Sequence, residues 1–167
     1  MGTLAHDVLA SFCLTQDGLA SMLGVSQKTV SLWASGQKEP SSRAKAILGR
    51  MIAALDVDSV VIGKDWNSAE IAPPAMAWEP VLAPKSVFTL PAYLDCSGRP
   101  ESRAIDPSTW DGMAYLHKRV MAFGAAKDFV VWASPEFMAR NLRDLVHPRQ
   151  LAMWDGYLRA IGATDGA

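Results

Sequence analysis

The side chains best suited to covalent or metal chemistry are few and lie far apart in this sequence. The histidines and cysteines are His6, His117, His147, Cys13 and Cys96. They form neither an HExxH pattern nor a Cys/His cluster, the arrangements on which zinc sites are built. Cys96 and His117 are one combination of nucleophile and base, but nothing local favours it over a buried thiol and a surface imidazole. We therefore expect no catalytic residues, no metal site and no cofactor.

A phosphate-binding loop is also disfavoured. Residues 24–29, GVSQKT, end in the lysine and threonine that such a loop carries. Gln27, however, stands where the motif requires glycine, and the first glycine of the motif is missing. The polar residues of this segment therefore need another explanation.

The charged side chains are distributed unevenly along the chain. The chain has 167 residues and a net charge of −1, and half of its residues are apolar, as is typical of a globular protein. Residues 1–50 carry five basic and three acidic side chains, residues 51–98 carry two and six, and residues 99–167 carry nine and eight. The basic start and the acidic, proline-rich middle indicate a domain boundary.

Targeting and membrane segments are not evident in the sequence. No apolar run approaches the roughly 18 residues that a membrane helix needs. The first ten residues, MGTLAHDVLA, lack the basic and then apolar layout of a signal peptide. Two cysteines are too few for a disulfide framework. We therefore expect a cytoplasmic, nucleoid-associated protein with no membrane partner.

Capping signals mark the elements of the first 55 residues. Thr15 and Ser26 each follow an apolar residue and precede a helical pattern, as an N-cap in a hydrophobic staple does. Gly24 lies between them, where a left-handed residue would end the first of the two helices. Two short helices joined by a tight turn are therefore predicted. A helix over 4–12 precedes them, and another, starting near positions 41 and 42, follows.

These residues resemble a known family. The run from Gln16 to Trp33, QDGLASMLGVSQKTVSLW, followed by Gly36 and Pro40-Ser41, is similar to the helix-turn-helix of the lambda-repressor/Cro-like (XRE) DNA-binding family. The similarity covers about residues 4–55, less than a third of the chain. It implies an N-terminal DNA-binding domain of four to five helices over 1–56.

In this family the second helix of the motif lies in the major groove of DNA. The resemblance therefore implies base contacts near the start of that helix, from Gln27, Lys28, Ser31 and Leu32. Gln27 can pair with adenine, Lys28 can donate to guanine, and Leu32 can touch a thymine methyl group or another protein. For Gln27 and Lys28 the alternative is an ordinary solvated surface.

Phosphate contacts are expected from the flanks of the motif. The candidates are Gln16, Ser26, Thr29, Lys38, Ser41, Arg43 and Lys45. Gln16 opens its helix, where free backbone N–H groups and the helix dipole favour an anion. The first segment carries a net charge of only +2, so a single motif is expected to bind modestly and a homodimer to double the contacts.

The rest of the chain predicts a linker and a second domain. Prolines 73, 74, 80 and 84 exclude a regular helix there, so 57–84 is interpreted as a proline-rich linker with a short strand over 60–62. Residues 85–167 are interpreted as a small α+β domain with strands over 86–90 and 128–133, the first of which continues over 93–96. Helices are expected from Asp106 and Pro107 to Phe123, and from Ser134 to about residue 161 with a break at 147–148.

The tryptophans and methionines of the second half are expected mainly in the core. These residues are Trp78, Trp110, Trp132, Trp154, Met113, Met121, Met138 and Met153. A ligand pocket or partner groove is the alternative.

Together the patterns predict a mainly α-helical protein with a small α+β C-terminal domain behind a helix-turn-helix head. The function expected is that of a sequence-specific, double-stranded DNA-binding transcriptional regulator, a homodimeric (auto)repressor on an inverted-repeat operator. The alternatives are an antitoxin that neutralises a toxin through its C-terminal domain, and a mobile-element inhibitor or adaptor with an autoregulatory head. In each case the C-terminal domain pairs with a second copy, a protein partner or a small effector.

Overall fold

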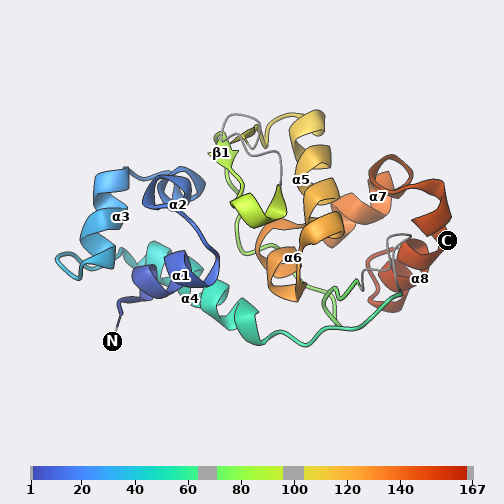
Figure 1. The fold of residues 1–167 in the computed structure, drawn as a ribbon, viewed down its shortest axis with the longest axis horizontal. Helices are drawn as coiled ribbons and strands as arrows, with labels where there is room; N and C mark the ends of the chain where they lie inside the picture. Colours follow the sequence, from blue (N-terminus) through green and yellow to red (C-terminus); the bar gives the residue numbers. More distant parts are fainter. Residues whose placement is uncertain (1, 64–70, 96–103, 165–167) are drawn as a thin grey trace. The chain divides into compact units, whose positions relative to one another are not determined.

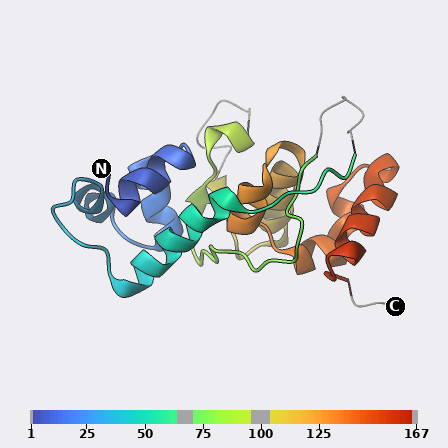
Figure 2. The same ribbon diagram turned by 90° about the horizontal axis from the view of Figure 1, so that it is seen from below.

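The computed structural model describes residues 2–63, 71–95 and 104–164. The protein is mainly helical with one small antiparallel sheet, which confirms the predicted fold class at this level (Figure 1). Figure 2 shows the same helices from below. The α-helices are α1 (Leu4–Ser11), α2 (Gln16–Leu23), α3 (Gln27–Ala34), α4 (Ser42–Ala53), α5 (Trp110–Phe123), α6 (Ala126–Trp132), α7 (Pro135–Leu145) and α8 (Leu151–Ala160). Short 3-10 helices are η1 (Ala54–Asp56), η2 (Ala92–Leu94) and η4 (Pro148–Gln150). Within the residues that the structure describes, no helix has the length and apolar character needed to cross a bilayer.

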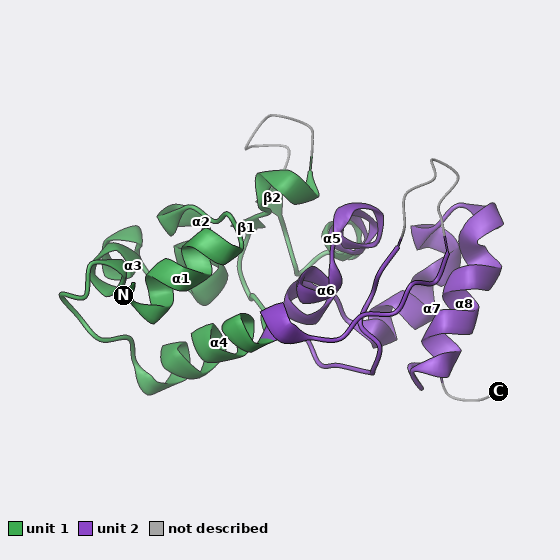
Figure 3. Cartoon of the chain, turned by 60° about the horizontal axis from the view of Figure 1, so that its bottom comes forward, with its two compact units in different colours: residues 1–53, 81–113 green, residues 54–80, 114–167 purple. Residues whose placement is uncertain are grey.

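The chain forms two compact units, and each is built from two separate segments (Figure 3). Unit 1 contains Met1–Ala53 and Val81–Met113, and unit 2 contains Ala54–Pro80 and Ala114–Ala167. These boundaries differ from the predicted ones. Most of the segment interpreted as a linker belongs to unit 2, and its last residues belong to unit 1.

The predicted helix ends of unit 1 are confirmed. Thr15 accepts a hydrogen bond from the Gly18 amide at 2.9 Å, and Ser26 accepts one from the Thr29 amide at 3.1 Å. Gly24 ends α2 in the left-handed conformation, with φ of 68°. The fourth helix begins at Ser42, as expected. The core of these helices comprises the buried residues Val8, Phe12, Leu19, Val30, Trp33 and Leu48.

The second segment of unit 1 holds the sheet. β1 (Phe88–Thr89) pairs antiparallel with β2 (Ala104–Ile105), and β1 packs against α2. The strand expected over 86–90 is therefore only two residues long. Its expected continuation over 93–96 is wrong for the described residues, because Pro91, which has no N–H to donate, begins the turn of η2 instead. Cys96 lies outside the described residues.

The start of α5 corrects another prediction. The helix begins at Trp110, because Asp106 forms a turn rather than a helix cap. The Asp106 carboxylate accepts hydrogen bonds from the Ser108 hydroxyl at 2.6 Å and the Ser108 amide at 3.0 Å. These bonds stabilise the charged form and lower the pKa of Asp106. The predicted end of the helix at Phe123 is confirmed.

The strand expected over 128–133 is wrong, because the segment is helix α6. A short apolar run does not distinguish a buried strand from a buried helix. The Asp128 carboxylate accepts a hydrogen bond from the Ala125 amide at 2.8 Å and so caps the helix. Phe129, Trp132 and Ala133, which are spaced three and four residues apart, are all buried.

The segment 57–80 packs into unit 2 through backbone and side-chain hydrogen bonds. The Val60 amide donates to the Pro73 carbonyl at 2.9 Å, and the Ile62 amide donates to the Ile71 carbonyl at 3.1 Å. These bonds lie in the segment where a short strand is expected over 60–62, but no strand forms there, and the isolated antiparallel bridge is between Ser59 and Pro74. The Tyr157 hydroxyl donates to the Pro74 carbonyl at 2.8 Å, across 83 residues of sequence. The segment is therefore part of a folded unit.

The predicted break between α7 and α8 is confirmed, with η4 between them. Trp132, Trp154, Met121 and Met138 are buried as expected of core residues, whereas the Trp110 side chain is half exposed. His117 is not a surface imidazole. It is fully buried, its Nε2 atom accepts a hydrogen bond from the Ser134 amide at 2.8 Å, and its ring stacks on Phe137.

Candidate nucleic-acid interface

The turn between α2 and α3 fixes how the first residues of α3 are presented. The Val25 amide donates to the Ala20 carbonyl at 3.0 Å, which closes the end of α2. A Cβ atom at Gly24 would meet nothing within 4 Å, so the left-handed backbone is the reason for glycine at this position. Ser26 then caps α3. The first turn of α3 therefore begins directly after a rigid, hydrogen-bonded corner.

The residues expected to contact bases differ in exposure. Gln27 and Lys28 are exposed, whereas Ser31 and Leu32 are half-buried. Val30 and Trp33 of the same helix are buried in the core of unit 1. The helix therefore exposes Gln27 and Lys28 at its start and is anchored in the core through Val30 and Trp33.

Two of the expected phosphate-contacting residues are bonded to each other. The hydroxyls of Ser26 and Thr29 lie 2.8 Å apart, and the Ser26 hydroxyl also accepts from the Thr29 amide. This pair stabilises the start of α3. A phosphate could use only the hydrogen-bonding capacity that these contacts leave.

The other expected phosphate-contacting residues fall into two groups. Gln16, Lys38 and Arg43 have at least part of their side chains accessible, and no ion pair is found for the two cations within the described residues. Ser41 accepts a hydrogen bond from the Ala44 amide at 3.2 Å, and Lys45 lies 2.6 Å from the carboxylate of Glu39. Glu39 therefore opposes the charge that Lys45 would offer to an anion.

A hollow of about 290 Å³ lies within unit 1 and was not foreseen from the sequence. Its walls come from the end of α2, from α4, and from the distant residues 81–83. Arg43 and Arg50 of α4 lie at this hollow, together with apolar side chains. The sequence contained one signal of this hollow, the spacing of seven residues between the two arginines, which places them on one face of α4.

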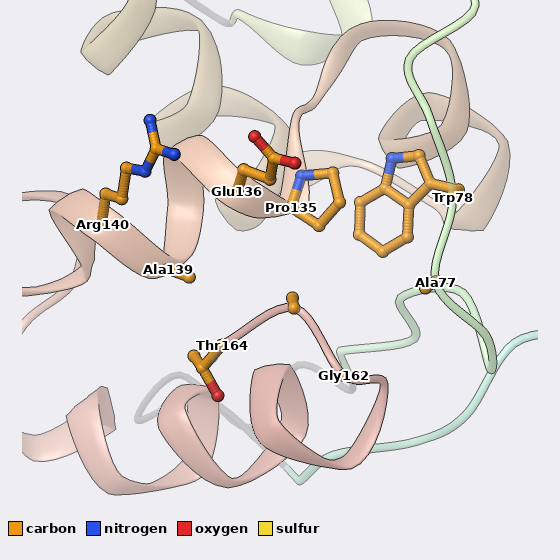
Figure 4. Close-up of a pocket in the computed structure, with 9 residues that line it drawn as sticks. Ala77, Trp78, Pro135, Glu136, Ala139, Arg140, Gly162 and Thr164 are labelled. Carbon is orange, nitrogen blue, oxygen red and sulfur yellow. The ribbon is translucent and has the colours of Figure 1, made fainter. Parts of the chain in front are cut away.

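A second hollow, of about 410 Å³, lies within unit 2 (Figure 4). Pro135 and Ala139 of α7 line one side of it, with the Trp78 ring beside Pro135, and Gly162 and Thr164 lie across from α7. The indole N–H of Trp78 donates to the Ala133 carbonyl at 2.8 Å, which fixes the orientation of the ring. The Thr164 hydroxyl is buried and has no hydrogen-bond partner among the described residues.

No grouping of three or more His, Cys, Asp or Glu side chains suited to a metal ion is found in residues 2–63, 71–95 and 104–164. Comparison with known proteins returned nothing: no family model, no curated protein and no solved structure matches the chain.

Proposed function

We propose that the chain is a sequence-specific, double-stranded DNA-binding transcriptional regulator, with α3 as the reading helix of a helix-turn-helix. The observation that carries the proposal is the corner at Gly24: two capped helices meet there, and the second one presents exposed Gln27 and Lys28 at its start. An amide and an ammonium group at the start of a groove-sized helix are suited to base edges.

The phosphate contacts in this proposal come from both sides of α3. Lys38 and Arg43 supply the charge, and Gln16 supplies a hydrogen bond at the start of α2. Lys45 contributes less, because its ion pair with Glu39 must open or be shared. So few cations give one copy modest affinity, which favours a homodimer that acts as a repressor on an inverted repeat.

Selection of bound sequences from random DNA with the purified full-length protein tests this proposal. We expect an inverted repeat whose half-sites each contain a few specified base pairs. Recovery of no enriched sequence, with binding that depends on salt alone, would contradict sequence-specific regulation.

A second role, effector binding by unit 2, is favoured by the hollow against Trp78. A small molecule with a flat apolar group would stack on the ring and complete the hydrogen bonding of Thr164. The antitoxin and adaptor alternatives would instead place a protein on unit 2. Mass spectrometry of the native protein purified from its source organism separates these roles, since it detects either a small ligand or a bound polypeptide.

A further inference from the structure

We propose that the hollow of unit 1 binds a small amphipathic anion, a molecule with an apolar body and a carboxylate, sulfonate or phosphate group. The hollow beside α4 is the ligand site, and Arg43 and Arg50 bind the anionic group of the ligand. The regulatory consequence of this binding, but not the binding itself, rests on the DNA-binding function proposed above.

The walls of the hollow suit an apolar body. Met22, Val81 and Leu82 are buried in the surrounding structure, and Ile47 is half-buried between the two arginines along α4. The three buried side chains give the hollow an apolar floor, and a ligand that covers the half-buried Ile47 removes apolar surface from water, at roughly 25 cal/mol per Å² of that surface. The volume of about 290 Å³ is close to the lower end of small-molecule sites, roughly 300 Å³.

The charge of the hollow has one sign. Arg43 and Arg50 are exposed, and neither has an ion pair within the described part of the chain. Among the residues that the structure describes, no acidic side chain lines the hollow. Seven residues separate the arginines, which corresponds to two turns, or about 10 Å along the helix axis. One end of a short ligand can therefore reach either guanidinium while its body covers Ile47.

Lys45, on the same helix, provides the contrast. It is neutralised by Glu39, so it offers an anion less than the arginines do. Guanidinium groups bind carboxylate, sulfonate and phosphate through paired hydrogen bonds. The combination of apolar walls and two unneutralised arginines selects an amphipathic anion over a neutral apolar molecule.

An occupied hollow would also affect DNA binding. Arg43 belongs to the phosphate-contacting residues proposed above, and a ligand anion on its guanidinium competes with the DNA backbone. The ligand would therefore act as an inducer, which releases the protein from its operator.

Titration with 8-anilinonaphthalene-1-sulfonate, a fluorescent amphipathic anion, tests the site directly in the full-length protein. We expect saturable binding that is at least about tenfold weaker in the double variant Arg43→Gln/Arg50→Gln, since a charge-assisted hydrogen bond is worth about a factor of ten. N-phenyl-1-naphthylamine, which lacks the sulfonate, should bind the wild type more weakly and should be insensitive to the double variant. Circular dichroism verifies that the variants are folded.

Two control variants locate the probe. Arg149→Gln removes an exposed cation outside both hollows and should leave the affinity unchanged. Arg140→Gln removes the arginine that lines the hollow of unit 2, and so measures any probe that binds there instead. The proposal is wrong if Arg140→Gln weakens the probe more than the double variant does, or if the double variant binds it as tightly as the wild type.

A DNA arm separates this proposal from the proposed function. The probe should lower the affinity of the wild type for its selected operator, and much less so in the double variant. If no DNA binds but the fluorescence results hold, the ligand site is supported and the regulator function fails. If operator binding is normal but the fluorescence results fail, the regulator function is supported and the ligand site is wrong.

Discussion

Gln27 and the Ser26–Thr29 pair illustrate how neighbouring polar residues divide their tasks. Ser26 and Thr29 use their hydroxyls to hold the start of α3, whereas the Gln27 side chain is exposed between them. A residue that carries no structural hydrogen bond can be changed without loss of the helix. Gln27 is therefore a clean test of base reading.

Replacing Gln27 with alanine should reduce discrimination at one base position per half-site by about 1–3 kcal/mol. Non-specific binding should hardly change, because an uncharged side chain releases no counterions. Competition binding against selected and scrambled DNA measures both quantities. An equal loss on both DNAs, or no change on either, would show that α3 does not read bases in this register.

Substitutions of Glu39 and Arg43 should change the affinity for DNA in opposite directions, and each should change it equally for all DNA sequences. Glu39→Gln removes an anion and frees Lys45 from a 2.6 Å ion pair, so it should tighten binding and steepen the salt dependence. Arg43→Gln should weaken binding and reduce the salt slope by about 1 for each phosphate that the arginine neutralises. Measuring the DNA affinity of each variant at several salt concentrations tests both expectations. A sequence-selective effect of either change would contradict a phosphate role.

Tyr157 links stability to alkaline pH. Burial raises the pKa of its phenol above the value of 10.0 that it has when unfolded. The neutral form is thus favoured in the fold, so its contribution to stability is full below pH 10 and is lost progressively as the pH rises above 10. Tyr157→Phe also removes the hydrogen bond to Pro74, at a cost of about 1 kcal/mol near neutral pH.

Urea unfolding of both proteins between about pH 7 and pH 11 tests this prediction. The wild type should be the more stable at neutral pH, and its advantage should shrink above pH 10. An advantage that stays constant throughout would show that the phenol is not shielded from water.

At the scale of elements, two glycines of unit 1 predict opposite results for the same substitution. Gly24 has a φ of 68°, so alanine there is strained by about 1–2 kcal/mol although space is available. Gly49 lies in the middle of α4, also with open space, so alanine there should stabilise the protein by about 0.5–1 kcal/mol. Chemical denaturation measures the change in the free energy of unfolding, and its sign, for each variant. Destabilisation at Gly49 as large as at Gly24 would refute the conformational explanation.

Local signals explain which elements could be predicted from the sequence. The caps at Thr15 and Ser26 and the turn at Gly24 depend on neighbours within four residues, and their prediction is confirmed. The strand predicted for the apolar run of α6 is wrong because periodicity over so few residues is ambiguous. The capping by Asp128 was the local signal that could have decided for a helix.

The candidate site was predictable only in part, for the same reason. Exposure of Lys28 follows from helix periodicity, and exposure of Gln27 follows from its place at the start of the helix. The ion pair of Lys45 with Glu39 depends on the path of the loop before α4, and the hollow depends on residues 81–83, far along the chain. Neither contact has a signature in local sequence.

At the scale of the whole molecule, we expect unit 2 to supply the apolar surface on which a second copy pairs. Its exposed large apolar side chains outside the helices include Val60, Val61 and Met76. We expect a dimer that binds two half-sites about one helical turn, roughly 34 Å, apart. Analytical ultracentrifugation with and without operator DNA measures the stoichiometry. Full affinity of a monomer for a single half-site would contradict this expectation.

The division of each unit into two segments has a consequence during synthesis. The chain passes from unit 1 to unit 2 after Ala53, returns after Pro80, and leaves again after Met113, inside α5. The four N-terminal helices emerge from the ribosome first, but the segment that completes their unit follows only after Ala54–Pro80. A nascent chain stalled before residue 81 would therefore hold α2 without the strand that packs against it. Its N-terminal helices should remain sensitive to protease until Val81–Met113 has emerged from the ribosome.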